Sequence, residues 1–335
     1  MANRLTIPGF VNAHSHAFQR ALRGHTEGGD FWAWRDAMLE LADRQTSERV
    51  RTGYEQVYGE MLAAGYTAVG EFHYLGFEQA LAAAEAAQAA GISFVLLYAA
   101  YARGGLDRFR QASPAEYLNQ VENLRDRGLE VGVAPHSVRA CPPNWLAQIG
   151  SYAAEHELVL HVHASEQPRE VEECIEEHGI RPIELLAKSG CLGPRTTIVH
   201  ATHADDAELD LLAQSGARIC VCPTTEANLG DGYFPVERVL VRDIPICIGS
   251  DSNARIDPLE ELRELEGIAR RSTLRRNVIA PEELLRIGAD QGAVALGLES
   301  WSDAEVDLGH RSLAGLDESD VLPALVFGSA ADVFA

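Results

Sequence analysis

The sequence predicts an α/β protein folded as a (β/α)8 barrel of the TIM type. Three observations predict this fold: short β-branched or apolar runs alternate with amphipathic stretches of helical period, there are eight such runs, and polar residues follow nearly every one. Repeated βα units form a parallel sheet, and eight strands are what barrel closure requires. An open doubly wound sheet would gather its polar residues at one crevice, so we favour the barrel.

The elements follow one another along the chain in this alternating order. The predicted strands end near His16, His73, Tyr98, Pro135, His163, His200, Cys222 and Asp251. The predicted helices cover residues 47–64, 78–90, 114–127, 143–156, 166–178, 205–215 and 235–241, and after the last strand 258–272 and 281–289. Residues 303–335 differ, because short apolar pieces such as 321–327 lack a helical stripe. We therefore predict a catalytic barrel over residues 1–300 and a C-terminal segment, 301–335, that is a remnant of a small β domain or a docked tail.

Composition limits the classes of function. With 335 residues, 46% of them hydrophobic, the chain can bury the core of one large α/β unit. The net charge of −22 argues against nucleic acid and against an anionic membrane, because both require a basic face. No apolar run is long enough to span a membrane and residues 1–9 contain no signal-peptide core, so we expect a cytoplasmic location.

The six cysteines are too sparse for a disulfide scaffold. Cys220, Cys222 and Cys247 fall in apolar strand-like runs, and we interpret them as reduced core thiols. A metal motif at Cys220 and Cys222 is the less favoured alternative, since one residue separates them and no second pair follows.

Four residues at predicted strand ends form a candidate metal site. His14 and His16 share a face of their strand, so both imidazoles can reach one ion. Catalytic Zn2+ takes His nitrogens and a carboxylate oxygen and keeps one position for water. A single His-X-His pair is weak, but fragments at several strand ends are hard to explain by chance. We predict one divalent metal, Zn2+ with Fe2+ as the alternative, held by His14, His16, His163 and Asp251.

His161 shares a face with His163, and either imidazole could reach the ion. Glu166 follows His163 by three residues, where a helix should begin, and this position favours His163. We expect His161 to pack or to hydrogen-bond within the barrel.

The catalytic groups are expected beside this site. A bound metal lowers the pKa of a water ligand towards neutrality, so a group must move a proton to the leaving nitrogen, and we predict that Glu166 does so. The alternative for Glu166 is a carboxylate favoured at a helix start. We predict that His200 polarises the electrophile or steadies the nucleophile, and that Asp251 is catalytic as well as a metal ligand. His203, three residues after His200, could be mistaken for the catalytic histidine, and we do not expect it to take part.

One metal is favoured over two. Barrel hydrolases that hold two metals often bridge them with a carbamylated lysine at the end of a central strand. Here the fourth strand ends at residues 134–136, which are Ala-Pro-His, and Lys188, the only lysine, lies on a helix after the fifth strand.

The chain resembles the amidohydrolase superfamily, specifically its mononuclear deaminase branch and, within that branch, the formimidoylglutamate deiminases. Phe-Trp-Ala-Trp-Arg at residues 31–35 and Thr-Glu-Ala-Asn-Leu-Gly-Asp-Gly at 225–232 are the most specific stretches. The others are residues 8–20, 71–74, 135–139, 163–167, 199–205 and 249–252, so the resemblance covers the chain from residue 8 to about 265.

This resemblance implies hydrolysis of N-formimino-L-glutamate to N-formyl-L-glutamate and ammonia, a step of histidine degradation. It implies the same metal ligands, the same roles for Glu166 and His200, and a homodimer. It also implies a set of substrate-binding residues: Gln19, Arg35, Tyr74, His136 and Arg139.

The physical chemistry of this anionic amidine substrate agrees. Two carboxylates and a cationic amidine require guanidinium groups at one end, which Arg35 and Arg139 can supply. The alternatives are that Arg35 is a surface ion-pair partner and that Trp32 and Trp34 are simple core aromatics.

The chain departs from the family at its ends and at one motif. It starts almost at the first strand and stops early, so we expect the family's small β-sandwich to be incomplete or reorganised. The family pattern Ser-Asp-Ser-His ends here in Asn253.

Two alternative functions stay open. One is a related deaminase of a nucleobase or another amidine; the other is a non-catalytic metal-binding scaffold, against which the presence of Glu166 and His200 argues.

Overall fold

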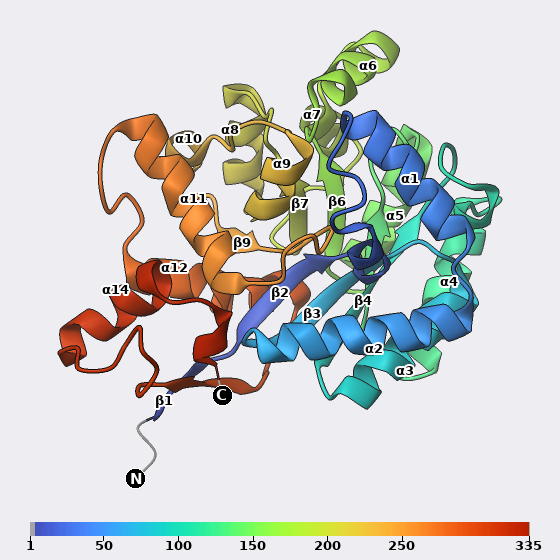
Figure 1. Ribbon diagram of the computed structural model, residues 1–335. Helices are drawn as coiled ribbons and strands as arrows, with labels where there is room; N and C mark the ends of the chain where they lie inside the picture. Colours follow the sequence, from blue (N-terminus) through green and yellow to red (C-terminus); the bar gives the residue numbers. More distant parts are fainter. Residues whose placement is uncertain (1–3, 335) are drawn as a thin grey trace.

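The computed structural model describes residues 4–334 and contains an eight-stranded parallel barrel surrounded by helices (Figure 1). The predicted barrel is therefore confirmed. Its strands follow chain order: β2 (Phe10–Ser15), β3 (Tyr66–His73), β4 (Ser93–Ala100), β5 (Val131–Pro135), β6 (Leu160–Ala164), β7 (Thr196–His200), β8 (Arg218–Val221) and β9 (Ile246–Ile248). Each ends within three residues of its predicted end.

Site residues themselves close the barrel between its first and last strands. The backbone N–H of His16 donates to the carbonyl of Asp251 at 2.8 Å, and the N–H of Asp251 donates to the carbonyl of His14 at 3.0 Å. Gly249 permits this approach, since a Cβ there would lie 2.7 Å from the same His14 carbonyl oxygen. The carboxyl ends of all eight strands thus meet at one mouth.

Helices connect successive strands and cover the barrel. They are α1 (Phe31–Asp43), α2 (Ser47–Ala63), α3 (Phe77–Ala90), α4 (Pro114–Asp126), α5 (Pro143–Glu155), α6 (Pro168–His178), α7 (Pro182–Lys188), α8 (Asp206–Ser215), α9 (Pro223–Leu229), α10 (Val236–Leu240), α11 (Pro258–Thr273), α12 (Pro281–Gly288), α13 (Asp290–Leu296) and α14 (Glu318–Gly328). Short 3-10 helices cover Ala17–Leu22 (η1), Asp107–Phe109 (η2) and Ala331–Val333 (η3). Among residues 4–334, no helix is long and apolar enough to cross a membrane.

The predicted helix ranges are present with small shifts, and some helices were not predicted. α6 begins at Pro168, so Glu166 lies in the connection before the helix, not on its first turn. The predicted ranges omit α1, α7, α9, α13 and α14. Most of these are only seven residues long, and α14 contains Pro323. A helix of seven residues, or one interrupted by proline, has no long amphipathic stripe by which it could be predicted from the sequence.

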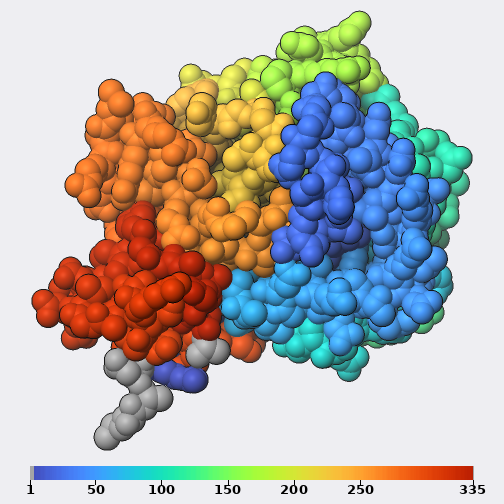
Figure 2. Space-filling view, in the orientation of Figure 1, coloured from blue at the N-terminus to red at the C-terminus, as the bar shows by residue number. Residues whose placement is uncertain are grey.

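The C-terminal segment packs on the outside of the barrel. β10 (Asp303–Asp307) pairs antiparallel with β1 (Arg4–Pro8), and α14 packs against α11 and α12. In Figure 2 this segment forms a red block beside the orange α11. The division at residue 300 stays a prediction, and the outer ends of its two segments, residues 1–3 and 335, lie outside the described residues.

Candidate active site

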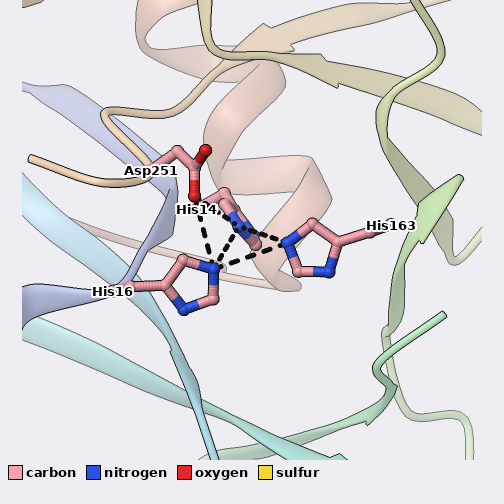
Figure 3. A group of neighbouring side chains, drawn as sticks. All are labelled: His14, His16, His163 and Asp251. Carbon is pink, nitrogen blue, oxygen red and sulfur yellow. Dashed lines mark hydrogen bonds and ion pairs between the residues drawn. The ribbon is translucent and has the colours of Figure 1, made fainter. Parts of the chain in front are cut away.

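The predicted metal ligands meet at the mouth of the barrel. His14 and His16 come from the end of β2, His163 from β6, and Asp251 from the turn after β9. The Nε2 atom of His14 lies 3.1 Å from the Nε2 atoms of both His16 and His163, and Asp251 Oδ1 lies 3.4 and 3.3 Å from the Nε2 atoms of His14 and His16. Figure 3 shows these four atoms turned toward a common point. The four residues could therefore hold one ion.

Hydrogen bonds to the far side of two rings fix which nitrogen is available. His16 Nδ1 lies 2.8 Å from the carbonyl of Phe72, and His163 Nδ1 lies 3.0 Å from the carbonyl of His136. Because a carbonyl only accepts, each Nδ1 carries the proton and each Nε2 presents its lone pair to the common point. Burial also lowers the pKa of His14 to about 3, which keeps its imidazole neutral at physiological pH. Lone pairs and a carboxylate oxygen this close together fit a cation.

The backbone at these strand ends adopts left-handed conformations that are rare outside glycine. Asp251 has φ 42° and His200 has φ 74°, and Ser165, Ala201 and Asn253 also have positive φ. Such conformations cost roughly 1–3 kcal/mol each and cluster at functional sites. The barrel therefore holds these residues in place against a local backbone preference.

His200 is held between three carboxylates. Its Nδ1–H donates to Glu226 Oε1 at 3.2 Å, and its Nε2 lies 3.7 Å from Glu166 Oε1 and 3.9 Å from Asp251 Oδ2. Burial alone would lower the pKa of His200, but the surrounding carboxylates outweigh burial and raise it to about 10. Burial likewise raises the pKa of Glu166. The arrangement thus places the Glu166 carboxyl group and the His200 imidazole close enough to exchange a proton. Both lie beside His14, His16, His163 and Asp251, which we call the metal group.

Glu226 has no predicted role in the sequence analysis, although it lies in the specific motif at residues 225–232. It is buried on α9, and its Oε1 also accepts from the backbone N–H of Cys222 at 2.9 Å. This second bond fixes the carboxylate that orients His200. The available signal was an acidic residue four residues after the predicted strand end at Cys222.

A cavity of about 280 Å³ opens above the metal group. Every predicted site residue lines this cavity except His14, which is fully buried beneath it. Gln19 Nε2 donates to the Tyr74 hydroxyl at 2.8 Å, and Arg139 Nη2 lies 3.7 Å from Glu166 Oε2. The Oε1 atom of Gln19 and the Nε atom of Arg139 are buried without a hydrogen-bond partner among the described residues. Polar atoms are thus available to a small molecule in the cavity.

The helix α1 forms part of the cavity wall. Asp30 caps it by accepting from the N–H of Ala33 at 3.0 Å. Arg35 is half-buried, lines the cavity and forms no ion pair within residues 4–334, so it is not the surface ion-pair partner of the alternative interpretation. Trp32 and Trp34 are also half-buried and line the cavity, and Trp34 packs against the hydrophobic core as well.

The surface above the site joins distant parts of the chain. In Figure 2 the blue segment of η1 and α1 meets the yellow segment around residues 225–235 on one face. Asn228 Nδ2 donates to Glu27 Oε2 at 3.2 Å across this junction. The motif at residues 225–232 thus helps to hold the loop that precedes α1.

The remaining candidate residues lie outside the site. His161 Nε2 donates to the carbonyl of Ala295 at 2.9 Å, and His203 Nε2 donates to the carbonyl of Asp231 at 2.7 Å. Lys188 forms an ion pair with Glu184 on α7 at 3.0 Å. These contacts agree with the structural roles expected for His161 and His203.

Asn253, the departure from the family motif, is fully buried. Its Nδ2 donates to the Ser15 hydroxyl at 3.1 Å and to the carbonyl of Asp251 at 3.0 Å, and its Oδ1 accepts from Ser250 at 2.6 Å. It therefore stabilises the turn that carries Asp251, and it does not line the cavity.

Fold and site together define a metal-dependent barrel hydrolase. The chain belongs to the amidohydrolase family, whose model matches residues 5–301. It is 38% identical to formimidoylglutamate deiminase of Pseudomonas aeruginosa over 97% of this chain and 79% of that protein. It is 29% identical to 5-methylthioadenosine/S-adenosylhomocysteine deaminase of Haloarcula marismortui, over 96% of this chain and 75% of that protein.

Solved structures agree with this membership. An amidohydrolase from Brucella melitensis superposes with a TM-score of 0.88 at 32% identity, covering 98% of this chain and 84% of that one. A zinc-bound adenosine deaminase from Xanthomonas campestris, at 23% identity, shares the fold with a TM-score of 0.90 over 99% of this chain and 78% of that one. This protein is thus a hydrolase that acts on C–N bonds, and its donor set supports a divalent metal.

Proposed function

We propose that the protein hydrolyses N-formimino-L-glutamate to N-formyl-L-glutamate and ammonia. One observation carries the proposal: a single cavity joins the metal group and Glu166 to the guanidinium groups of Arg35 and Arg139, while Arg103, the third arginine that lines it, is paired with Glu177. In a chain of net charge −22, two arginines on one cavity wall provide a local site for an anionic substrate. The identity of 38% to a formimidoylglutamate deiminase supports the same substrate.

The residues would divide the reaction among themselves. Arg35 and Arg139 would each bind a substrate carboxylate, while Gln19, Tyr74 and His136 would orient the formimino group. Glu166 would take a proton from the attacking water and deliver it to the departing nitrogen as ammonia. His200, oriented by Glu226, would donate a hydrogen bond to the oxygen that attacks, and Asp251 would accept one from the same water.

The proposed cofactor is one Zn2+ ion, with Fe2+ as the alternative. Three imidazole nitrogens and one carboxylate oxygen match the ligands that zinc takes in catalytic sites. When bound, the metal would supply a water activated at neutral pH. Metal analysis of the purified protein, and activity after reloading with each ion, would distinguish the two.

A second candidate substrate is a purine nucleoside or another cyclic amidine. The aromatic side chains of Trp32, Trp34 and Tyr101 line the same cavity and could stack on a base. The adenosine-type deaminases among the relatives motivate this candidate. Paired arginines favour the dicarboxylate, because a planar base makes no use of them.

The deciding experiment measures ammonia release from metal-loaded protein with each substrate, with and without a chelator. We expect release from N-formimino-L-glutamate that the chelator abolishes, and little from 5-methylthioadenosine. The opposite preference would replace the proposal by the second candidate. A homodimer and a cytoplasmic location also stay proposals; sedimentation and cell fractionation would test them.

A further inference from the structure

Asp251 presents its two carboxylate oxygens to two different groups of side chains. Oδ1 lies 3.4 and 3.3 Å from the imidazoles of His14 and His16, whereas Oδ2 lies 3.9 Å from His200 Nε2. His200, Cys222 and Asp251 form a second buried group whose ligand atoms all lie within 4.8 Å of one another. The two groups share only Asp251, so its carboxylate is placed to bridge two neighbouring ions.

His200 has the surroundings of a metal ligand. Its Nδ1–H donates to Glu226, and this bond to an outer carboxylate fixes the ring and raises the basicity of the opposite nitrogen. Nε2 lies at ion-pair distance from Glu166 and Asp251 but makes no hydrogen bond to any described residue. The side chain is 1% exposed, so this nitrogen is shielded from bulk water.

Cys222 adds a soft ligand to this group. It follows β8 directly and is fully buried in a small apolar cluster with Cys220 and Cys247. Thiolate sulfur together with an imidazole selects zinc and other soft divalent ions over magnesium or calcium. On binding, sulfur–metal and nitrogen–metal bonds form, and the thiol proton of Cys222 and the Nε2 proton of His200 both leave to solvent.

We propose that His200 Nε2, Cys222 Sγ and Asp251 Oδ2 form a second, weaker site for a soft divalent cation such as Zn2+ or Cd2+. An ion in this site engages His200 and so removes it from the reaction. Excess metal therefore inhibits the enzyme that one metal activates. The inhibition rests on the proposed function, whereas the binding of the cation does not.

Cadmium titration of the metal-loaded protein tests the binding, because a thiolate–cadmium bond absorbs in the ultraviolet. We expect the band to grow as a second equivalent binds, to vanish in Cys222→Ala and Cys222→Ser, and to persist in Cys247→Ala. Cys247 is the matched control, being a buried thiol of the same cluster that is not in the ligand group. Absence of the band in the wild type, or its persistence in both Cys222 variants, would overturn the proposal.

Inhibition by excess zinc provides the second readout. Each variant is compared with its own uninhibited rate, and we expect Cys222→Ser to raise the half-inhibiting zinc concentration by about 10- to 100-fold or more. An unchanged half-inhibiting concentration would contradict the inhibitory role. If the cadmium band behaves as expected but N-formimino-L-glutamate releases no ammonia, the proposed function fails and the cation site stands.

Discussion

The metal group and the wall of the cavity above it are built in different ways. Two ligands, His14 and His163, lie on barrel strands, His16 directly follows β2, and Asp251 lies three residues after β9; all are at most 5% exposed. The wall is carried by elements added to the barrel: Gln19 lies in η1, Arg35 in α1 and Arg139 in the connection between β5 and α5, with 23% of its side chain exposed. The comparison indicates that the barrel fixes the metal ligands, whereas Gln19, Arg35 and Arg139, which we propose to bind substrate, lie in segments that can vary without altering those ligands.

The largest effect should come from removing a ligand. We expect Asp251→Ala to lower ammonia release by at least about 10⁴-fold and to lower bound metal, because the ligand and the catalytic group are lost together. Metal analysis and activity assays would measure both. Arg271→Met, an exposed residue of α11, is the control. Retained metal with full activity would show that Asp251 is not part of the site.

The second-largest effect should come from Glu166, the proposed proton-transfer group, which lies between the metal ligands and the cavity wall. Glu166→Gln keeps the shape of the side chain but cannot carry a proton, so we expect kcat to fall by about 10²- to 10⁴-fold with metal still bound. Equal loss of metal and activity would instead assign Glu166 to the metal group.

A variant in the cavity wall should change substrate specificity without changing the metal content of the protein. We expect Arg139→Met to lower kcat/KM for N-formimino-L-glutamate by about 100-fold, since a buried carboxylate would lose its charged partner. Metal content should stay at the wild-type level. If the protein turned over 5-methylthioadenosine, and Arg139→Met lowered kcat/KM for that substrate by the same factor, Arg139 would not be specific for the dicarboxylate.

The closure of the barrel between β2 and the turn after β9, which we call the seam, should be destabilised by one added methyl group. Gly249→Ala places a Cβ 2.7 Å from the His14 carbonyl oxygen, and we expect it to destabilise the fold by about 1–3 kcal/mol and to weaken metal binding. Gly53→Ala, in α2 with nothing within 4 Å of its Cβ, is the control and should not weaken the metal site. Thermal unfolding with and without chelator would measure both, and equal behaviour of the two variants would contradict a tight seam.

The last prediction concerns the pH dependence of stability. It involves Glu71, which does not line the cavity, so we expect its variant to have the smallest effect on the reaction. This residue of β3 is fully buried, and its Oε1 accepts from the N–H of Ala17 at 2.8 Å. Burial raises the pKa of Glu71 from 4.5 to about 8, so between these values the folded state keeps a proton that the unfolded state has lost. The free energy of unfolding should therefore decrease as pH rises from 5 to 8, by up to about 4 kcal/mol from this group.

Urea unfolding at both pH values measures this dependence. Glu71→Gln should flatten it, and Glu55→Gln, an exposed residue of α2, should not. A dependence that Glu71→Gln leaves unchanged would assign it to other groups.

The sequence predicted those features that rest on local patterns. His14 and His16 are separated by one residue at the end of an apolar run, and both the strand and the shared face follow from that spacing. Glu226 was not predicted as a site residue because its contact with His200 joins α9 to the end of β7, and no local pattern specifies such a contact. The pairing of β1 with β10 joins residues 4–8 to residues 303–307, and no local pattern specifies such a pairing. The stabilising role of Asn253 likewise depends on contacts across the barrel seam.

The closure of the barrel by its own metal ligands has a consequence for biosynthesis. His14 and His16 leave the ribosome early, but Asp251 follows the last strand, so the complete ligand set exists only when the whole barrel has been made. An ion held by these residues would cross-link the first strand to the turn after the last one. The full set of four ligands is therefore available only in a finished barrel, and a chain truncated before Asp251 would have neither the closure between β2 and β9 nor that full set.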